Sequence, residues 1–353
     1  MVKYLRLLLL PFSLLYGAVV IFRNRLYDLG VFRQERFDLP VIVVGNLVVG
    51  GSGKSPVAEY LVRLLEGYKI AVLSRGYGRE TKGFILAGPR ATAQTIGDEP
   101  MQFYSKFPHI TVAVCEDRAK GINLLKDQHD LILMDDAYQH RRVKPGLSIL
   151  LFEYQKLLST QFLLPAGNLR EPFWGYKRAD LLLVTKTPAL LEAKGRLKCS
   201  KKFDPGTHIN ISFSFISYGN LKHLFSGETK LSNSINKDTV VFLLTGIANP
   251  LPLVNQLEKY TNNLRHHDYP DHHNYSRSNI ERLVTAFKSD PGKEKIIITT
   301  EKDAQRLLAV SFKELLLNLP VFYLPIEIDL QKEDKATFDQ KILNYVSSTT
   351  RNR

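Results

Sequence analysis

The sequence predicts an α/β protein: a parallel β-sheet covered by helices on both faces, joined to a smaller C-terminal α/β domain. Runs of strand length that are apolar throughout recur along the first half of the chain, and segments of helical character separate them. Strands buried on both faces read this way, whereas half-exposed strands alternate apolar and polar residues. A second series of such runs starts at residues 240–250, which indicates the second domain.

The first element is an apolar, uncharged run at residues 7–22, LLLLPFSLLYGAVVIF, with basic residues on both sides. A helix that spans a bilayer needs about 20 apolar residues, and Pro11 is expected to kink or end this one. A signal peptide needs a small-residue cleavage site, and none is evident here; a buried core helix is the other alternative. Because the flanking arginines suit anionic headgroups, we expect residues 1–30 to lie in or dip into a membrane surface.

Residues 41–56, VIVVGNLVVGGSGKSP, organise the first domain. An apolar strand leads into a glycine-rich turn, and a helix is expected at 54–66. Such a turn and helix N-terminus present backbone N–H groups to phosphates. In a phosphate-binding P-loop the lysine reaches the β- and γ-phosphates and the next hydroxyl holds Mg²⁺. Val48 replaces the usual first glycine, so an ordinary βα turn is the alternative. The predicted nucleotide-binding residues are Gly50, Gly51, Ser52, Gly53, Lys54 and Ser55.

Further strands are expected at 69–78, 110–115, 130–135, 147–152 and 180–185. The motifs SRGYG, CEDR, DDAYQH and TKTP lie at their carboxyl ends, where active sites of parallel sheets are found. Asp135 and Asp136 end one buried strand. Adjacent buried carboxylates favour a cation, which predicts a Mg²⁺ site opposite the P-loop. A loop that happens to begin with two aspartates is the alternative.

Short alternating segments such as HINISFSF at 208–215 predict an antiparallel connection between the domains. A helix at 278–288 and a strand at 295–300 continue the second α/β unit. The expected boundaries are a P-loop domain at residues 31–206, hinge strands at 207–236 and a smaller domain at 237–353.

Three other motifs carry reactive groups. GDEP at 97–100 places Asp98 and Glu99 in an expected tight turn. LPAGNLREP at 164–172 offers Arg170 as a bidentate phosphate contact and Glu171 as a metal ligand, although the two could equally form a surface ion pair. HHDYPDHHNY at 266–275 holds four histidines whose spacing does not match a standard zinc site. We expect one of them to transfer a proton or contact phosphate.

The formal net charge is +13, from 48 basic and 35 acidic residues. It suggests an anionic partner: nucleic acid, an anionic membrane or a phosphorylated substrate. We expect no nucleic-acid partner, because no recognised nucleic-acid-binding motif accompanies the charge. Cys115 and Cys199 make neither a disulfide framework nor a metal cluster, which fits a reducing compartment.

The ordered set GNLVVGGSGKSP, SRGYGR, GDEP, DDAYQH, LPAGNLREP, LTGIANP, DYPDHH and TTEKDA resembles the motifs of the tetraacyldisaccharide 4'-kinase family, the lipid A 4'-kinases. The resemblance implies transfer of the γ-phosphate of ATP, with Mg²⁺, to the 4'-hydroxyl of a tetraacylated glucosamine disaccharide 1-phosphate. It implies a P-loop domain joined by a two-stranded hinge to a smaller α/β domain. It also implies a protein on the cytoplasmic face of the Gram-negative inner membrane, peripheral or monotopic, with the lipid A precursor and membrane lipids as partners. We expect a monomer.

The resemblance also implies residue roles. Asp98 and His272 would form a dyad that takes the proton of the attacking hydroxyl, and Lys54 would serve the phosphates. Ser55, Asp135, Asp136 and Glu171 would surround Mg²⁺. Helpers near the phosphates would be Gln139, His140 and Arg170, and contacts to the sugar phosphate or nucleotide would be Arg75, Tyr77, Arg118 and Asn168. Ala137, Tyr138 and Asn168 depart from the family's usual residues, which affects the expected loop geometry and not the expected activity.

The alternative function is a membrane-tethered P-loop NTPase switch without an acceptor substrate. A GTPase switch would carry an Asn-Lys-x-Asp motif that reads the base, and TKTP at 185–188 is not one. Hydrolysis as the main activity, independent of any acceptor, would favour this alternative.

Overall fold

The structure is a computed structural model that describes residues 6–204, 209–271 and 273–351. The chain divides into two compact units. The first consists of Met1–Ile216 together with Ile328–Arg353, and the second of Ser217–Glu327.

The first unit is built on a nine-stranded sheet with the order β15-β8-β7-β6-β1-β5-β2-β4-β3. Its strands are β1 (Val41–Asn46), β2 (Ile70–Ser74), β3 (Ile85–Leu86), β4 (Thr111–Val114), β5 (Leu131–Asp135), β6 (Leu147–Glu153), β7 (Leu181–Thr187), β8 (Asn210–Tyr218) and β15 (Ile326–Leu330). The pairs from β4 through β8 are parallel, while β3 pairs antiparallel with β4. All residues of β1, β2 and β5 are buried, as the continuous apolar runs predict.

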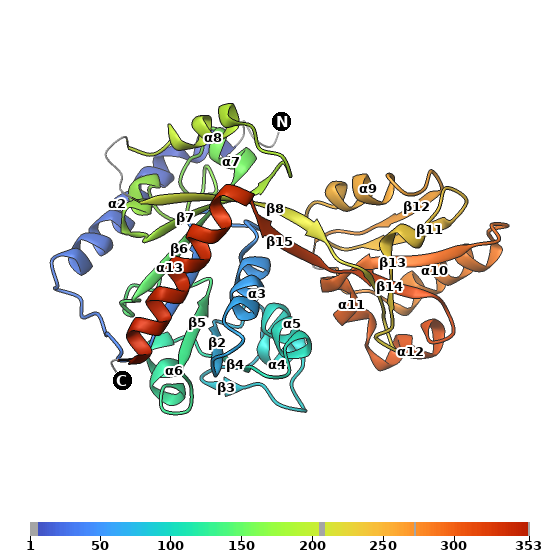
Figure 1. Cartoon of the computed structure of the whole chain (residues 1–353), viewed down its shortest axis with the longest axis horizontal. Coiled ribbons are helices and arrows are strands. Elements are labelled where there is room, and N and C mark those ends of the chain that lie inside the picture. Colours follow the sequence, from blue (N-terminus) through green and yellow to red (C-terminus); the bar gives the residue numbers. More distant parts are fainter. Residues whose placement is uncertain (1–5, 205–208, 272, 352–353) are drawn as a thin grey trace. The chain divides into compact units, whose positions relative to one another are not determined.

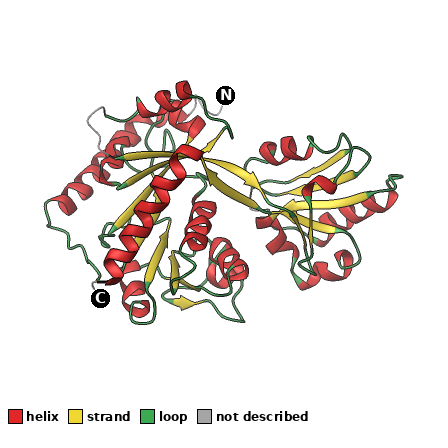
Figure 2. Cartoon of the chain, viewed as in Figure 1, coloured by secondary structure: helices red, strands yellow, loops and turns green. Residues whose placement is uncertain are grey.

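Helices cover both faces of this sheet (Figure 2). One face packs against α3 (Lys54–Leu64), α5 (Asp98–Lys106) and α13 (Lys332–Arg351), in a core that includes Leu61, Phe103 and Phe338. The opposite face packs against α6 (Arg118–Leu125), α7 (Tyr154–Leu158), the 3₁₀ helix η2 (Phe173–Arg178) and α8 (Ala193–Ser200). A short α4 (Ala93–Ile96) precedes α5. The P-loop NTPase-like α/β fold predicted from the sequence is confirmed.

The N-terminal apolar segment forms a 3₁₀ turn, η1 (Arg6–Leu9), and the helix α2 (Leu10–Asp28). Together they are long and apolar enough to cross a membrane by length and composition. Pro11 does not kink or end the helix; it lies in the first turn, where no backbone N–H is required. The buried residues of α2 are Ser13 and Gly17, whereas its large apolar side chains are exposed, so it is not a core helix.

The second unit has a six-stranded sheet with the order β10-β9-β14-β13-β11-β12. Its strands are β9 (Leu221–His223), β10 (Thr229–Lys230), β11 (Val240–Thr245), β12 (Leu264–Asp268), β13 (Lys295–Thr300) and β14 (Val321–Leu324). Strands β11 to β14 pair in parallel, and β9 pairs antiparallel with β14. One face packs against α10 (Arg277–Ser289), α11 (Glu301–Leu307) and α12 (Val310–Leu316), and the other against α9 (Leu251–Leu257); the 3₁₀ turn η3 (Ser232–Ser234) precedes β11.

The observed division differs from the expected boundaries in two ways. The expected hinge at 207–236 is divided between the units: β8 pairs in parallel with β7 and lies beside β15 in the first sheet, while β9 and β10 belong to the second unit. The last segment, β15 and α13, belongs to the first unit and not to a domain at 237–353. The physical reason is that β15 lies beside β8 in the first sheet and that Phe338, Ile342 and Val346 of α13 are buried against that sheet.

Candidate active site

The glycine-rich loop between β1 and α3 is held in shape by buried polar contacts. Asn46, at the end of β1, donates from Nδ2 to Ser52 Oγ at 2.5 Å and to the Gly50 carbonyl at 3.4 Å. Gly50 and Gly53 have φ values of 106° and 82°, in the left-handed region that glycine adopts without strain. The loop therefore has one well-defined course into the N-terminus of α3.

Lys54 and Ser55 begin helix α3 next to this loop. The Lys54 side chain is only 9% exposed, and its Nζ lies 3.6 Å from Asp136 Oδ2. Parallel pairing of β1 with β5 sets Val44 beside Asp135, so the carboxyl ends of both strands meet at one edge of the sheet. The predicted juxtaposition of the P-loop and the DDAYQH motif is thus present.

Asp135 is buried, at 1% exposure, and its Oδ1 has no hydrogen-bond partner among the described residues. Burial raises its pKa to about 8, and the nearby charges of Glu99 and Asp136 act in the same direction while Lys54 opposes them. Without a cation, burial therefore favours the neutral form of this carboxyl. A bound divalent ion would favour the carboxylate.

Asp136 has the opposite environment, because its carboxylate is already paired with cations. Arg170 donates from Nη1 at 2.9 Å and from Nη2 at 3.2 Å to its two oxygens, in the bidentate geometry typical of Arg–carboxylate pairs. Its backbone has a φ of 46°, an uncommon conformation for a residue with a side chain. This conformation accompanies the contacts of Asp136 to Lys54 and Arg170.

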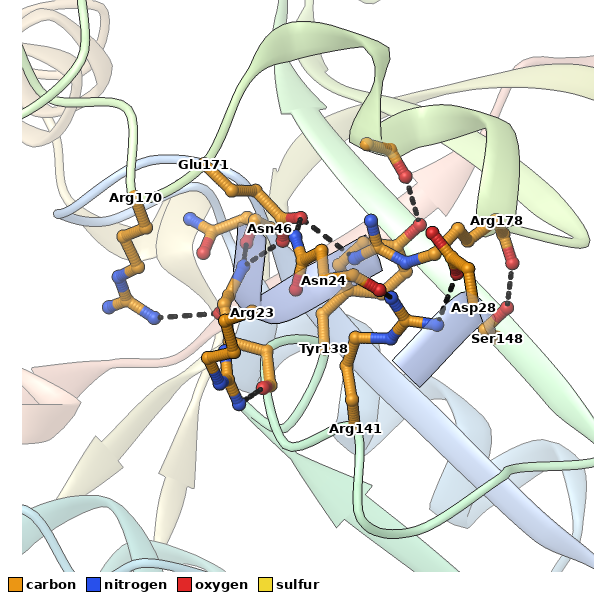
Figure 3. Close-up of polar contacts among 12 residues, drawn as sticks. Arg23, Asn24, Asp28, Asn46, Tyr138, Arg141, Ser148, Arg170, Glu171 and Arg178 are labelled. Carbon is orange, nitrogen blue, oxygen red and sulfur yellow. Dashed lines mark hydrogen bonds and ion pairs between the residues drawn. The ribbon is translucent and has the colours of Figure 1, made fainter. Parts of the chain in front are cut away.

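Glu171 lies in a closed polar network (Figure 3). It is 1% exposed; Oε2 accepts from Asn24 Nδ2 at 3.2 Å and from Arg178 Nη2 at 2.8 Å, and Oε1 accepts from Gln139 Nε2 at 2.9 Å. Gln139 also donates to the Asn46 carbonyl at 2.8 Å. Because both oxygens are occupied by donors, these contacts do not support the predicted role of Glu171 as a metal ligand. The alternative of a surface ion pair with Arg170 is also wrong, since Glu171 is buried and pairs with Arg178.

The segment that carries Arg170 is joined to the phosphate loop through its backbone. Val49 N donates to the Asn168 carbonyl at 2.8 Å, and Arg170 N donates to the Leu47 carbonyl at 2.7 Å. Asn168 is exposed, and its Oδ1 accepts from Arg6. The backbone of Asn168 therefore supports the loop, while its expected contact to the sugar phosphate or nucleotide stays a prediction.

A basic group lies near Asp136. Arg118 is 5% exposed and donates to the Cys115 and Glu116 carbonyls; burial and the charge of Arg75 lower its pKa, while Asp136 raises it. His140 has a pKa lowered to about 4 by burial and by Arg118, so its imidazole is neutral at pH 7. Tyr77 is 85% exposed. Tyr138 donates its hydroxyl to the Gly175 carbonyl at 2.7 Å.

The GDEP motif does not form a tight turn, because Asp98 and Glu99 begin helix α5. Acidic residues in the first turn are favoured by the helix dipole, and Pro100 is tolerated there. Gly97 precedes the helix with a φ of 95°, and a Cβ at this position would lie 2.9 Å from the Tyr77 carbonyl. Glu99 is close enough to Asp135 to raise its pKa, which brings the start of α5 to the same edge as the P-loop.

His272 lies outside the described residues, so the predicted dyad with Asp98 stays a prediction. In the second unit, the neighbouring His273 stacks on Tyr269 with ring centroids 4.7 Å apart. His266 contacts Thr245 Oγ1 at 2.8 Å, and burial lowers its pKa. The TTEKDA motif supports the fold here: Asp303 accepts from Thr300 Oγ1 and from the Gly246 N–H.

Sequence reasoning missed several residues that shape the site. Asn46 braces the loop from within the strand, and Thr185 donates to the Ser52 carbonyl at 2.8 Å. Lys186, with a φ of 56°, donates to the Gly51 carbonyl. The role of Asn46 could have been found from the sequence, because it is a polar residue at the end of an otherwise apolar strand. The contacts of Thr185 and Lys186 could not, because both residues lie on β7, far from the loop in the sequence.

The residues present fit a Mg²⁺ ion coordinated jointly with phosphate. The described residues contain no group of three or more His, Cys, Asp or Glu side chains that would hold a metal by themselves. Mg²⁺, however, is usually bound through one or two carboxylates together with substrate phosphates and water. The unpartnered Oδ1 of Asp135 and the Ser55 hydroxyl at the start of α3 suit that arrangement.

A braced glycine-rich loop at the N-terminus of a helix, opposite a buried acid at the end of a parallel strand, defines a P-loop nucleotide-binding protein. A family model described as Tetraacyldisaccharide-1-P 4'-kinase matches residues 5–347. The chain belongs to this family.

Similar proteins cover nearly the whole chain. It is 43% identical to the tetraacyldisaccharide 4'-kinase of Flavobacterium psychrophilum, over 99% of each chain. It is 42% identical to that of Bacteroides thetaiotaomicron, over 98% of this chain and 94% of the relative. Among solved structures, LpxK from Aquifex aeolicus in complex with ATP matches with a TM-score of 0.75 and 30% identity, over 97% of this chain and 99% of that one.

Proposed function

We propose that this protein transfers the γ-phosphate of ATP to the 4'-hydroxyl of a tetraacyldisaccharide 1-phosphate in lipid A biosynthesis. The observation that carries the proposal is the convergence of the phosphate loop, the buried Asp135 and the Arg170–Asp136–Lys54 chain at one sheet edge. Full-length similarity to kinases of this name supports the choice of acceptor.

The nucleotide role falls to the loop residues Gly50, Gly51, Ser52 and Gly53, with Lys54 and Arg170 as the cations. Both cations lie against Asp136, so phosphate oxygens compete with that carboxylate for them. Phosphoryl transfer depends mainly on positioning and on neutralising charge, and Mg²⁺ supplies part of that by bridging phosphate oxygens. Ser55 and Asp135 are the proposed metal-binding residues, because Asp136 and Glu171 already have partners.

Asp98, with His272, is the proposed base for the acceptor hydroxyl. Support comes from the start of α5, which lies near Asp135, and from the family resemblance of GDEP and DYPDHH. General-base catalysis contributes typically about 10²–10⁴-fold. The basic pair Arg75 and Arg118 is the proposed contact for the anionic 1-phosphate or the nucleotide.

We further propose that α2 holds the monomeric protein on the cytoplasmic face of the inner membrane, lying in the interface and not spanning the bilayer. Its outer face exposes Phe12, Leu15, Val19 and Phe22, each 60% exposed or more. Its inner face makes polar contacts with the protein from Ser13 to Asp28, whereas a helix that spans the bilayer by itself would lack them. An apolar outer face on a protein-bound helix is typical of interfacial association.

The direct test uses purified protein, Mg²⁺–ATP and the tetraacyl disaccharide 1-phosphate in detergent, with the lipid product analysed by mass spectrometry. The proposal predicts a gain of one phosphate, on the sugar that does not carry the 1-phosphate. Lys54→Ala is the control, and it should form product far more slowly than the wild type. ATP hydrolysis without any phosphorylated lipid would contradict the proposal and favour an NTPase switch.

A further inference from the structure

Helix α2 contacts the protein through a face that carries Ser13, Gly17 and Asn24, while Phe12, Leu15 and Phe22 on another face are exposed. Ser13, 3% exposed, donates to the Leu163 carbonyl and accepts from Ala166 N. A Cβ at Gly17 would lie 2.7 Å from Leu163 Cδ1, so the helix sits tightly on this segment. The inner face of α2 is therefore fitted to the segment that leads to Arg170 and Glu171.

A first series of contacts runs from α2 to the P-loop lysine. The Tyr16 hydroxyl donates to the Arg170 carbonyl at 2.7 Å, while the Arg170 backbone N–H is bound to Leu47. The Arg170 guanidinium holds Asp136, which lies 3.6 Å from Lys54. Loss of the Tyr16 hydroxyl would free one side of the backbone from which the guanidinium projects.

A second series reaches the loop itself. Asn24 Nδ2 binds Glu171, Glu171 accepts from Gln139, and Gln139 donates to the Asn46 carbonyl. Asn46 then binds Ser52 and Gly50 of the loop. Figure 3 shows Asn24, Glu171 and Asn46 in this arrangement, with Arg178 on the other side of Glu171. Both Glu171 carboxylate oxygens accept hydrogen bonds and the Nδ2 and Nε2 groups of the series donate them, which holds these side chains in place, although Asn46 Oδ1 has no partner among the described residues.

We propose that Tyr16 and Asn24 of helix α2 are positioning residues for the phosphate loop, which they serve through Arg170 and through Glu171 with Gln139. The inference rests on the proposed function in that the loop binds Mg²⁺–ATP. It assigns α2 a second task besides membrane attachment, because the outer face is available to lipid while the inner face orders the nucleotide site.

If α2 positions the loop, changes in its inner face alter the affinity for Mg²⁺–ATP. If α2 only stabilises the fold, they alter the melting temperature alone. Contacts along a path do not establish coupling by themselves, so the test must measure it. A double-mutant cycle does this: if Tyr16 acts through the Arg170 side chain, its replacement loses its effect once that side chain is removed. A contribution to overall stability alone would leave nucleotide affinity unchanged in either background.

The experiment measures the affinity of the full chain for Mg²⁺–ATP by calorimetry, without any lipid acceptor. The variants are Tyr16→Phe, Arg170→Ala and both together. Tyr27→Phe is the matched control, because it removes a hydroxyl from the same helix for which the described part of the chain shows no hydrogen bond. A second cycle pairs Asn24→Ala with Gln139→Ala. Melting temperatures are recorded for every variant.

We expect Tyr16→Phe to weaken Mg²⁺–ATP binding about 3–10-fold, the range for one lost hydrogen bond, and to have less than about a twofold further effect in Arg170→Ala. Asn24→Ala should weaken binding to a similar extent and lose its effect in Gln139→Ala. Tyr27→Phe should leave the affinity for Mg²⁺–ATP unchanged. Equal losses in both backgrounds, or a lower melting temperature with unchanged affinity, would overturn the inference. Because the readout needs no acceptor, failure of the lipid kinase assay alone would count against the proposed function and not against this inference.

Discussion

Replacing Asp135 by asparagine should make the metal-free protein more stable at neutral and alkaline pH. The side chain is 1% exposed, and burial raises its pKa to about 8 from the ordinary 3.8. Between about pH 4 and pH 8 the unfolded chain has lost this proton while the folded protein keeps it. The free energy of unfolding therefore falls as pH rises through this window. The contribution of this carboxyl is lost fully only above its pKa in the folded protein.

The size of the effect follows from proton linkage. One proton retained in the folded state and absent in the unfolded state changes the free energy of unfolding by about 1.4 kcal/mol per pH unit. From pH 5.5 to pH 7.5 the wild type should lose up to about 3 kcal/mol that Asp135→Asn does not lose. For a domain of this size the difference corresponds to roughly 6–12 °C in melting temperature.

The assay is urea unfolding at several pH values with a chelator present, for wild type, Asp135→Asn and Asp127→Asn. Asp127 is an exposed aspartate of the same unit and serves as the matched control. If burying the uncharged amide destabilises the protein, it lowers the free energy of unfolding of Asp135→Asn equally at every pH. The slope of that free energy against pH is unaffected. A stability difference from wild type that is the same at pH 5.5 and pH 7.5 would refute the buried, neutral carboxyl. The same variant should lose phosphate transfer, since its amide oxygen carries no charge for Mg²⁺.

Three further predictions follow from the same geometry. Lys54→Ala should lower the rate of phosphate transfer by about 10²–10³-fold, because a buried cation next to the transferred phosphate is lost; steady-state kinetics measures this, and near-normal turnover would remove Lys54 from the site. Replacing Phe12, Leu15 and Phe22 by serine should abolish co-sedimentation with anionic vesicles, since each exposed apolar side chain contributes about 1.5–3 kcal/mol when buried in lipid; unchanged sedimentation would place the anchor elsewhere. Phe338→Ala should cost about 3–5 kcal/mol in urea unfolding, because this 1% exposed side chain fixes α13 on the first sheet; a loss below 1 kcal/mol would contradict that packing.

The parallel sheet and the phosphate loop could be predicted because their signals are local. Continuous apolar runs mark strands buried on both faces, and the glycines before Lys54 mark a turn that must approach phosphate closely. The helical start of α5 was also readable: Gly97 followed by two acids and a proline is a helix N-terminal pattern. The expected tight turn was wrong because Gly, Asp and Pro favour the first turn of a helix as well as a reverse turn.

The place of the C-terminal helix could not be read from the sequence. Its assignment to the first unit depends on β15 lying beside β8, two segments more than a hundred residues apart, and no local pattern encodes that contact. The partners of Glu171 are equally non-local, since Asn24 comes from the N-terminal helix and Gln139 from the loop after β5. A glutamate in this motif suggested a metal ligand. In the folded protein both oxygens of Glu171 accept hydrogen bonds from side chains distant in the sequence.

The inner face of α2 could be predicted from the sequence only in part. Ser13 and Gly17 interrupt the apolar run at 7–22 and continue at helical spacing into Asn24 and Asp28, so one polar or small stripe was visible. What that stripe packs against was not, because the segment at residues 163–171 has no signal that names its partner. An anchor and a structural part of the site can therefore share one helix, on opposite faces.

The most direct test of the central claim follows the label from γ-labelled ATP, with and without the tetraacyl disaccharide 1-phosphate in detergent. Wild type and Asp98→Ala are run side by side, with Mg²⁺–ATP affinity measured for both. The account predicts acceptor-dependent label on the lipid that is lost in Asp98→Ala, with affinities within about twofold of each other. Label released only as free phosphate, indifferent to the acceptor and to Asp98, would contradict it.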